Sequence, residues 1–326
     1  MKKTNLFAVL ALAVTPAFLH AQTTNYSDIV GYQTSVVPVG LKALGFPLLN
    51  PNLVSGAVTS NTSNSITISG ASGISSLLNP STPYYVEVTS GTLEGERFDV
   101  DVAATTTDTV GINISSANNT EVLTSGALSG ASVALRAHVT ISQIQSMFSG
   151  SLVGNNTQGS ADQIIVVDGG ATRTYYLRGD GITWRTSGTT NNQASVAIPP
   201  GKGILFKKIS SSNSITATGT VRANNFARNY ASGFQINAAG FPVESSPSNL
   251  GGTSANGWVG NNTQSAADQI SPIVSGAPKT YYLRSDGASW RTSGTTNNQA
   301  AVLFLASDEA YYVKKTTGGS FLELKP

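Results

Sequence analysis

Short stretches of alternating apolar and polar residues recur along the chain, separated by clusters of Gly, Asn, Ser and Pro. A period of two is typical of β-strands, because successive side chains point to opposite faces of a sheet. The pattern predicts strands at Ala57–Thr59, Ser65–Ser69, Tyr84–Thr89, Arg97–Val102, Thr109–Ile114 and Val133–Ile141. One short helix is expected at Ile141–Phe148. Since no long helices alternate with the strands, we expect an all-β, multidomain protein with β-sandwich or barrel-like domains.

The strongest regularity is an internal repeat. Residues 154–196 and 260–302 align without a gap at an offset of 106, and 30 of the 43 paired positions are identical. Two stretches match letter for letter: TYYLR at 174–178 and 280–284, and WRTSGTTNNQA at 184–194 and 290–300. Such self-similarity indicates a tandem duplication.

A weaker repeat suggests how the chain is divided. The segment that begins Ala43-Leu-Gly-Phe-Pro resembles Ala238-Ala-Gly-Phe-Pro, but it lies much further from its copy of the strong repeat. The simplest explanation is one repeat unit with an extra domain inserted. We predict a signal peptide at 1–21, unit one at 22–53 plus 151–222, an inserted β domain at 54–150 and unit two at 223–326.

Each copy of the repeat contains a hairpin with the sequence TYYLR-x-DG-xx-WR. Asp180-Gly181 predicts a two-residue type I′ turn, in which both turn residues have positive φ. This turn places Leu177 opposite Trp184 and Tyr176 opposite Arg185. Alternation gives one face to Tyr175, Leu177 and Trp184. The other face carries Tyr176, Arg178 and Arg185, and in the second copy Tyr282, Arg284 and Arg291.

These Tyr–Arg faces have two interpretations. In the first, the tryptophans are core anchors and the tyrosines and arginines form a solvated cation–π ladder. In the second, the two faces are paired binding sites for a glycan or another polymer. We expect the identical SGTTNN loops to be turns. Asp162 and Asp268, each just before a strand, are expected to be turn or cap residues, since no cluster of calcium ligands surrounds them.

Catalytic chemistry is not indicated. The chain has no cysteine, and alternation places His138 on the polar side of a strand beside Arg136 and Thr140. No nucleophile elbow or phosphate loop occurs. The one acidic cluster, Glu94, Glu96, Asp99 and Asp101, has the pattern of an exposed strand face with Arg97 as an internal partner. We therefore expect no enzyme, no metal site and no cofactor.

The N-terminus is typical of an export signal. Lys2 and Lys3 precede an apolar stretch from Leu6 to Leu19, and Ala21 provides a small residue for cleavage. Without residues 1–21, Lys and Arg fall from 19 to 17 and balance 17 Asp and Glu, so the mature chain is formally neutral. Neutrality disfavours nucleic-acid binding. No mature segment is long enough for a transmembrane helix, so we expect export to the periplasm, the cell surface or the medium.

Four sequence features carry a family resemblance: SDIVGY at 27–32, YYVEVTSGTLEGERFDV at 84–100, VALRAHVTISQI at 133–144 and the TYYL…W hairpin. In these the chain resembles a family of uncharacterised secreted β-rich proteins of verrucomicrobial bacteria. The resemblance covers roughly residues 27–222, and unit two echoes part of it. It implies export and a β-rich fold and says nothing about a ligand.

These observations together predict a non-enzymatic structural or adhesive protein at the cell surface or in the extracellular matrix. Exposed β edges in a chain of low charge favour association with copies of itself. The alternative is a carbohydrate-binding module that recognises an extracellular polysaccharide through the paired Tyr–Arg faces.

Overall fold

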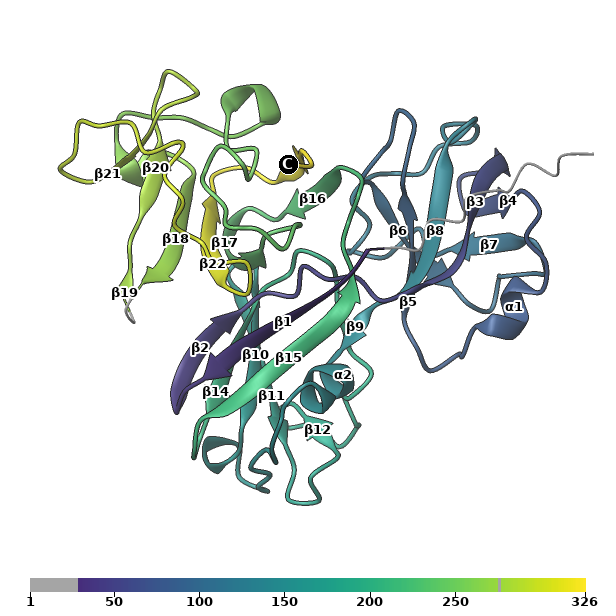
Figure 1. The fold of residues 1–326 in the computed structure, drawn as a ribbon, viewed down its shortest axis with the longest axis horizontal. Helices are drawn as coiled ribbons and strands as arrows, with labels where there is room; N and C mark the ends of the chain where they lie inside the picture. The colour runs from purple at the N-terminus through teal and green to yellow at the C-terminus, as the bar shows by residue number, and fades with distance from the viewer. Residues whose placement is uncertain (1–28, 275–276) are drawn as a thin grey trace, which may run out of the picture.

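The computed structural model describes residues 29–274 and 277–326, so the predicted signal peptide lies outside the described residues. The described chain is mostly β-strand, with little helix, and its strands build a closed barrel, two large open sheets and three two-stranded sheets (Figure 1). The predicted all-β, multidomain class is therefore confirmed. Within the part of the chain that the structure describes, no helix is long and apolar enough to cross a membrane.

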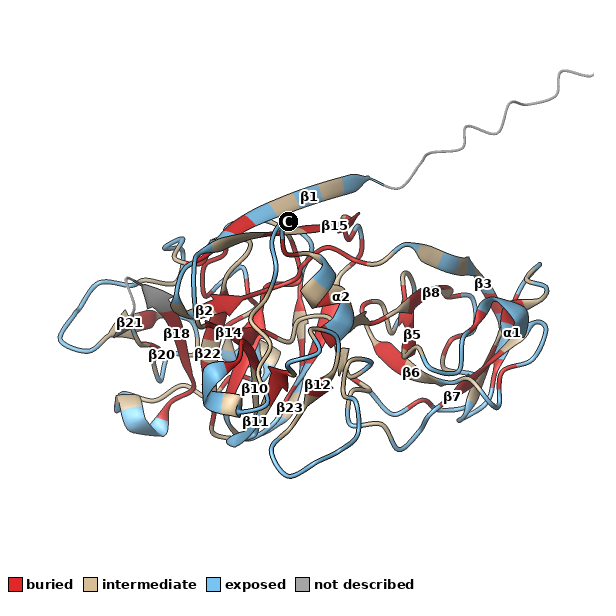
Figure 2. Ribbon diagram, turned by 90° about the horizontal axis from the view of Figure 1, so that it is seen from below, coloured by how far each residue is buried: buried red, intermediate tan, exposed pale blue. Residues whose placement is uncertain are grey.

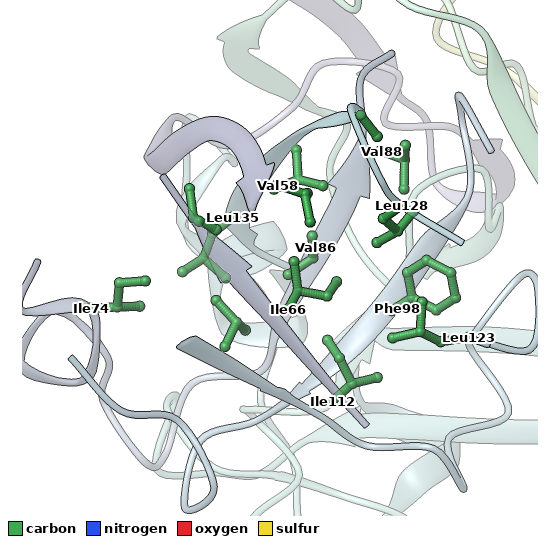
Figure 3. Close-up of a cluster of buried hydrophobic side chains, with 14 of the residues drawn as sticks. Val58, Ile66, Ile74, Val86, Val88, Phe98, Ile112, Leu123, Leu128 and Leu135 are labelled. Carbon is green, nitrogen blue, oxygen red and sulfur yellow. The ribbon is translucent and has the colours of Figure 1, made fainter. Parts of the chain in front are cut away.

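The barrel follows the first two strands of the chain. Its strands close in the order β3 (Asn52–Asn61), β4 (Ser65–Ile68), β7 (Thr109–Ile112), β6 (Arg97–Asp101), β5 (Tyr84–Val88) and β8 (Ser132–Ala137). Each contains or overlaps a predicted strand. A short helix, α1 (Ile74–Leu77), lies between β4 and β5. Inward-facing aliphatic side chains and Phe98 fill the interior (Figure 3). Burial of this alternating set explains why six short strands close here.

Unit one is built around a five-stranded sheet. Its order is β12 (Trp184–Arg185), β11 (Ala171–Leu177), β10 (Gln163–Asp168), β14 (Ile204–Lys208) and β2 (Gly40–Leu44). A separate two-stranded ribbon pairs β1 (Val30–Val37) with β15 (Asn213–Thr220). A third small sheet pairs β9 (Val139–Thr140) with β13 (Ala197–Ile198).

The predicted helix is α2 (Ile141–Ser146), which follows β9 directly. Thr140 caps it, because its hydroxyl accepts the backbone N–H of Gln143. Ile141 and Ile144 pack into the core of unit one, although the sequence division assigned them to the insert.

Unit two contains the second large sheet and the second ribbon. The sheet order is β21 (Trp290–Thr292), β20 (Tyr281–Leu283), β18 (Gln269–Val274), β22 (Ala310–Lys315) and β17 (Gly233–Ala238), with β19 (Ala277–Pro278) also paired to β18. The ribbon pairs β16 (Phe226–Tyr230) with β23 (Gly319–Glu323). Short 3₁₀ turns precede β10 and β18 at equivalent positions, Gln158–Ser160 and Gln264–Ala266, and a third lies at Ser254–Asn256.

The two units therefore have the same strand order. Position by position, β12, β11, β10, β14 and β2 correspond to β21, β20, β18, β22 and β17. The ladders also fix the register: Gly40 lies opposite Lys208, and Gly233 lies opposite Lys315. This register makes Ala43 equivalent to Ile236, so the sequence pairing of Ala43 with Ala238 was wrong by two residues. Four shared letters were too few to set the register of a strand.

The two large sheets meet in a reciprocal contact. Gly45 N–H donates to the carbonyl oxygen of Asp308 at 2.8 Å, and Ala238 N–H donates to that of Gly201 at 2.9 Å. These donors and acceptors are equivalent positions of the two units, so the contact has approximate twofold symmetry. Between the sheets lies a small apolar cluster of Ala43, Leu205, Ile236 and Ala310.

Candidate functional site

The predicted strand register of the hairpins is confirmed in both copies. Leu177 pairs with Trp184 and Tyr176 pairs with Arg185, and the second copy repeats these pairs. Tyr175, Leu177 and Trp184 all lie in the core of unit one. The tryptophans are therefore core anchors, as the first interpretation expected.

The turn of each hairpin differs from the prediction. Gly181 has a φ of 74°, but Asp180 does not have positive φ, so the type I′ turn was wrong. Instead, a carboxylate oxygen of Asp180 accepts the N–H groups of Ile182 at 3.0 Å and Thr183 at 2.8 Å. Hydrogen bonds from the Thr183 side chain and these two backbone groups lower the pKa of Asp180 to about 2. Only Gly181 has a positive φ, and the turn is closed by hydrogen bonds to the Asp180 side chain.

The Tyr–Arg faces have almost the same geometry in both copies. The guanidinium Nη1 of Arg178 donates to the Tyr176 hydroxyl at 3.2 Å and to the carbonyl oxygen of Asn156 at 3.3 Å. Arg284 makes the equivalent bonds to Tyr282 and Asn262 at the same distances. The Nη1 donors of these arginines are therefore already used in hydrogen bonds within their own units.

The tyrosine rings are not open platforms. Tyr176 and Tyr282 are each only 7% exposed. In the first sheet Tyr176 lies in a row between Gln163 and Arg185, with Lys207 on the far side of Gln163. A ring held within such a row offers little flat surface for stacking against a sugar.

The structure does not bring the two faces together. Figure 1 shows β12 at the lower end of unit one and β21 at the outer end of unit two, with the contact between the large sheets between them. The two sets of predicted site residues, Tyr176, Arg178, Arg185 and Tyr282, Arg284, Arg291, are therefore separate surfaces. A single ligand would have to span the two-unit body to touch both.

The acidic strand was predicted to have an exposed face; Asp101 is exposed, but the prediction was wrong for Arg97 and Asp99. Arg97 is buried, and Asp99 is hydrogen-bonded to His138, whose Nε2 lies 2.8 Å from a carboxylate oxygen. His138 is itself buried and packs against Tyr85, with ring centroids 4.6 Å apart. The prediction failed because alternation cannot show that a second element covers a strand.

The Asp99–His138 pair does not form a catalytic triad. Ser116 Oγ donates at 2.6 Å to Asp99 and not to the imidazole, and no hydroxyl of the described residues is hydrogen-bonded to the ring of His138. Asn118 also donates to Asp99, at 2.9 Å. The hydrogen bond and charge of His138, with help from Ser116 and Asn118, hold the pKa of Asp99 below its usual value in spite of burial. The arrangement serves to fix the loop after β7 against β6.

Asp162 and Asp268 are more than turn residues. Each is fully buried and forms an ion pair, with Lys208 at 2.6 Å and with Lys315 respectively. Each also accepts two backbone N–H groups, from Val153 and Ile209 in the first unit. The remaining lone pairs of the carboxylate are satisfied in this way, as a buried ion pair requires. These residues hold the strand end β14 or β22 to the segment before β10 or β18.

The clearest unoccupied surface is the outer side of the β1–β15 ribbon. Val30, Tyr32 and Val36 point outward along β1 and are 72%, 80% and 62% exposed. Figure 2 shows this ribbon along the margin of the molecule with its outer side uncovered. Among the described residues β1 pairs with no strand other than β15, so no strand of the described chain occupies its second edge. Neither strand carries a charged residue.

The inner side of β1 is anchored to unit two. Gln33 Nε2 donates to Ser307 Oγ at 2.6 Å, and the Ser35 hydroxyl donates to Asp308. Val37 is buried in the core of unit one. The strand is therefore held in place, and only its outer side and one edge are available.

The equivalent strand in unit two is covered. β16 pairs with β23 on one edge, and the barrel contacts its other edge. Ala227 N–H donates to the carbonyl oxygen of Gly95 at 3.1 Å, and its own carbonyl accepts from Arg97 Nη1 at 2.8 Å. The same position in the two units is thus occupied in one and open in the other.

Neither a metal cluster in the described chain nor a known relative indicates the function. Residues 29–274 and 277–326 contain no group of three His, Cys, Asp or Glu side chains that could hold a metal ion. The chain matches no known family, no curated protein and no solved structure. The site must therefore be interpreted from its geometry alone.

Proposed function

We propose that this protein is a non-enzymatic structural or adhesive protein that associates with copies of itself through the open edge of β1. The observation that carries the proposal is the uncharged, unpaired edge of an eight-residue strand with three exposed apolar side chains. Natural proteins usually protect such an edge with Lys, Pro, a bulge or a covering segment. In unit two the barrel provides that cover.

A second copy is the partner that fits this edge. Backbone pairing supplies hydrogen bonds without a charged ligand, and the outward Val, Tyr and Thr side chains suit a cross-strand neighbour of the same kind. Two β1 strands that pair in antiparallel fashion about a twofold axis would bring Val30 and Tyr32 of one copy toward Val36 of the other. The single chain already contains one approximate twofold contact between its units.

Export and membership of the verrucomicrobial secreted family belong to the same proposal. Both rest on the sequence, since residues 1–21 lie outside the described part of the chain. A structural protein without catalytic activity agrees with the position of His138, whose ring is hydrogen-bonded to Asp99 and to no hydroxyl of the described residues.

The test is the molar mass of residues 22–326 by size exclusion with light scattering, with Val36→Lys and Tyr32→Lys beside the wild type. A lysine on the outer face should stop edge pairing, so both variants should run as monomers while the wild type runs as an oligomer. Ile182→Lys is the matched control, because Ile182 is equally exposed but lies in the hairpin turn. Variants that keep the mass of the wild type would contradict the proposal.

Glycan binding by the Tyr–Arg faces is the alternative. The burial of Tyr176 and Tyr282 weighs against it. The separation of the two hairpins also means that a short ligand could not bind both faces at once. The double variant Tyr176→Ala/Tyr282→Ala should abolish retention on immobilised polysaccharide if the alternative holds. Under the structural proposal it should leave self-association intact.

A further inference from the structure

A concave site lies where the barrel, unit one and unit two meet. It is a pocket of about 340 Å³, large enough for a monosaccharide-sized molecule. The barrel contributes Arg97, Asn118 and Thr120; unit one contributes Asp168 and the segment 199–202; unit two contributes Arg228, Asn229 and Asn237. Pockets at the junctions of domains are common binding sites. The proposed self-association does not involve this region.

Arg97 brings a buried positive charge to the pocket wall. It is 5% exposed, and its guanidinium lies 4.3 Å from the centre of the Phe226 ring. Its side chain makes one hydrogen bond, from Nη1 to the carbonyl oxygen of Ala227. Among the described residues no carboxylate forms an ion pair with it, and Nε and Nη2 have no acceptor. Burial lowers its pKa to about 10, so it remains a cation at neutral pH.

The other cations of the wall already have anionic partners. Arg228 pairs with Glu323 and also donates to the carbonyl oxygens of Gly201 and Ala238. Lys202 forms an ion pair with Asp168 at 2.8 Å. Within the described part of the chain, Arg97 is therefore the cation of this wall that has no carboxylate in contact with it. A buried charge of this kind normally has a partner.

Asn237 adds an independent observation. This residue lines the pocket and is 5% exposed, and its side-chain Nδ2 is buried without a hydrogen-bond acceptor among the described residues. Unsatisfied buried amide donors are rare in folded proteins, because each costs the free energy of its lost hydration. An acceptor group inside the pocket would satisfy it.

We propose that the junction pocket binds a small carboxylate-bearing ligand, such as a uronic acid, with its carboxylate on Arg97 and an oxygen on Asn237. The open Nε and Nη2 of a guanidinium form the fork that binds a carboxylate through two parallel hydrogen bonds. The ion pair of Lys202 with Asp168 supplies further polar groups for sugar hydroxyls. The carboxylate can belong to a free sugar acid or to the end of a polysaccharide.

The test is titration calorimetry of the full mature chain with sodium glucuronate, and with glucose as the neutral match. Glucuronate should bind and glucose should not. Arg97→Met should weaken glucuronate binding at least about tenfold, since it removes the paired charge. Arg173→Met is the control, because Arg173 is an exposed arginine of β11 that lies outside the pocket and outside the Tyr–Arg faces. It should bind as the wild type does.

Asn237→Ser provides a second, milder variant in case Arg97→Met does not fold, which circular dichroism would show. It should weaken glucuronate binding about threefold or more, as the loss of one hydrogen bond predicts. An alginate oligosaccharide separates the two sources of the carboxylate: binding of it as well as of glucuronate assigns a chain end, and binding of glucuronate alone assigns a free acid. Absence of glucuronate binding to the wild type, equal binding of glucose, or unchanged affinity in a folded pocket variant would overturn the proposal.

Discussion

Unit one and unit two have the same strand order but different neighbours. In unit one the β1–β15 ribbon has an open edge and an exposed apolar side, and in unit two the barrel contacts the equivalent β16. The sequences follow this difference: β1 has exposed Val30, Tyr32 and Val36, whereas β16 has the buried Phe226 and Arg228. A single fold position can therefore be an internal contact in one copy and an available surface in the other.

The cores of the two units also differ around a shared framework. Trp184 Nε1 donates to the Gln145 side chain of α2 at 2.7 Å, whereas Trp290 Nε1 donates to the carbonyl oxygen of Gly252 at 2.6 Å. Lys315 lies 4.2 Å from the centre of the Trp258 ring, inside an aromatic cluster that unit one lacks among its described residues. Both units share the hairpin and the buried Asp–Lys pair. Equivalent substitutions at these positions should therefore have similar effects on the stability of the two units.

The largest expected effect is loss of the buried lysines. Lys208→Met and Lys315→Met each leave a fully buried carboxylate without its partner. Each should lower the free energy of unfolding by about 3–5 kcal/mol. Urea unfolding followed by tryptophan fluorescence measures this, since Trp184 reports on unit one and Trp258 and Trp290 report on unit two.

The double variant Asp162→Asn/Lys208→Met is the control for this prediction. It removes both charges and should be less destabilised than Lys208→Met alone, because no unpaired carboxylate remains. A single lysine variant with nearly unchanged stability would show that the pair does not hold the unit together.

A smaller effect is expected at the contact between the units. A Cβ at Gly203 would lie 2.5 Å from Ala310 Cβ and 2.8 Å from the carbonyl oxygen of Asn237. Gly203→Ala should therefore destabilise the protein by about 1–3 kcal/mol by overpacking. Gly159→Ala serves as a check on general glycine effects, since a Cβ added there would meet no atom within 4 Å and, like Gly203, Gly159 does not have a positive φ. Equal losses of stability in the two variants would show that overpacking at the contact is not the cause.

Gln145→Ala should destabilise the core of unit one and leave the core of unit two unaffected. It removes the acceptor of Trp184 Nε1 and should cost about 1 kcal/mol of stability. The fluorescence of the tryptophans in unit two should keep its wild-type transition, because the acceptor of Trp290 is a backbone carbonyl. Equal loss in both units would show that they unfold as one body.

The smallest effect concerns the hairpin turns at low pH. The pKa values of Asp180 and Asp286 are about 2, below the ordinary 3.8, since backbone and side-chain hydrogen bonds favour both carboxylates. The stabilisation that each turn gains is present above about pH 3.8 and is lost as the pH falls through about 2. NMR titration of the two carboxyl carbons should give nearly equal midpoints. A midpoint near 3.8 in either copy would show that its turn is not closed by the aspartate.

The sequence was sufficient for features that depend on neighbouring residues. The alternation around Leu177 and Trp184 predicted the hairpin register and its core face, and the strands of the barrel followed from the same period. The turn type was missed because the Asp180 side chain, and not its backbone, satisfies the turn.

Partners distant in the chain could not be predicted. Asp162 and Lys208 are 46 residues apart, and the Asp99–His138 pair joins residues 39 apart across the barrel wall. Arg97 was assigned to an exposed face because nothing in its own strand shows that Phe226 will cover it. Whether the second face of a strand is buried depends on the whole fold, so it cannot be predicted from a local period of two.

The most direct test of self-association is the mass and shape of purified residues 22–326, by size exclusion with light scattering and negative-stain images of the same fractions. We expect a dimer or a larger assembly joined at the β1 edge. A monomer at every concentration would contradict self-association and would leave ligand binding as the function to pursue.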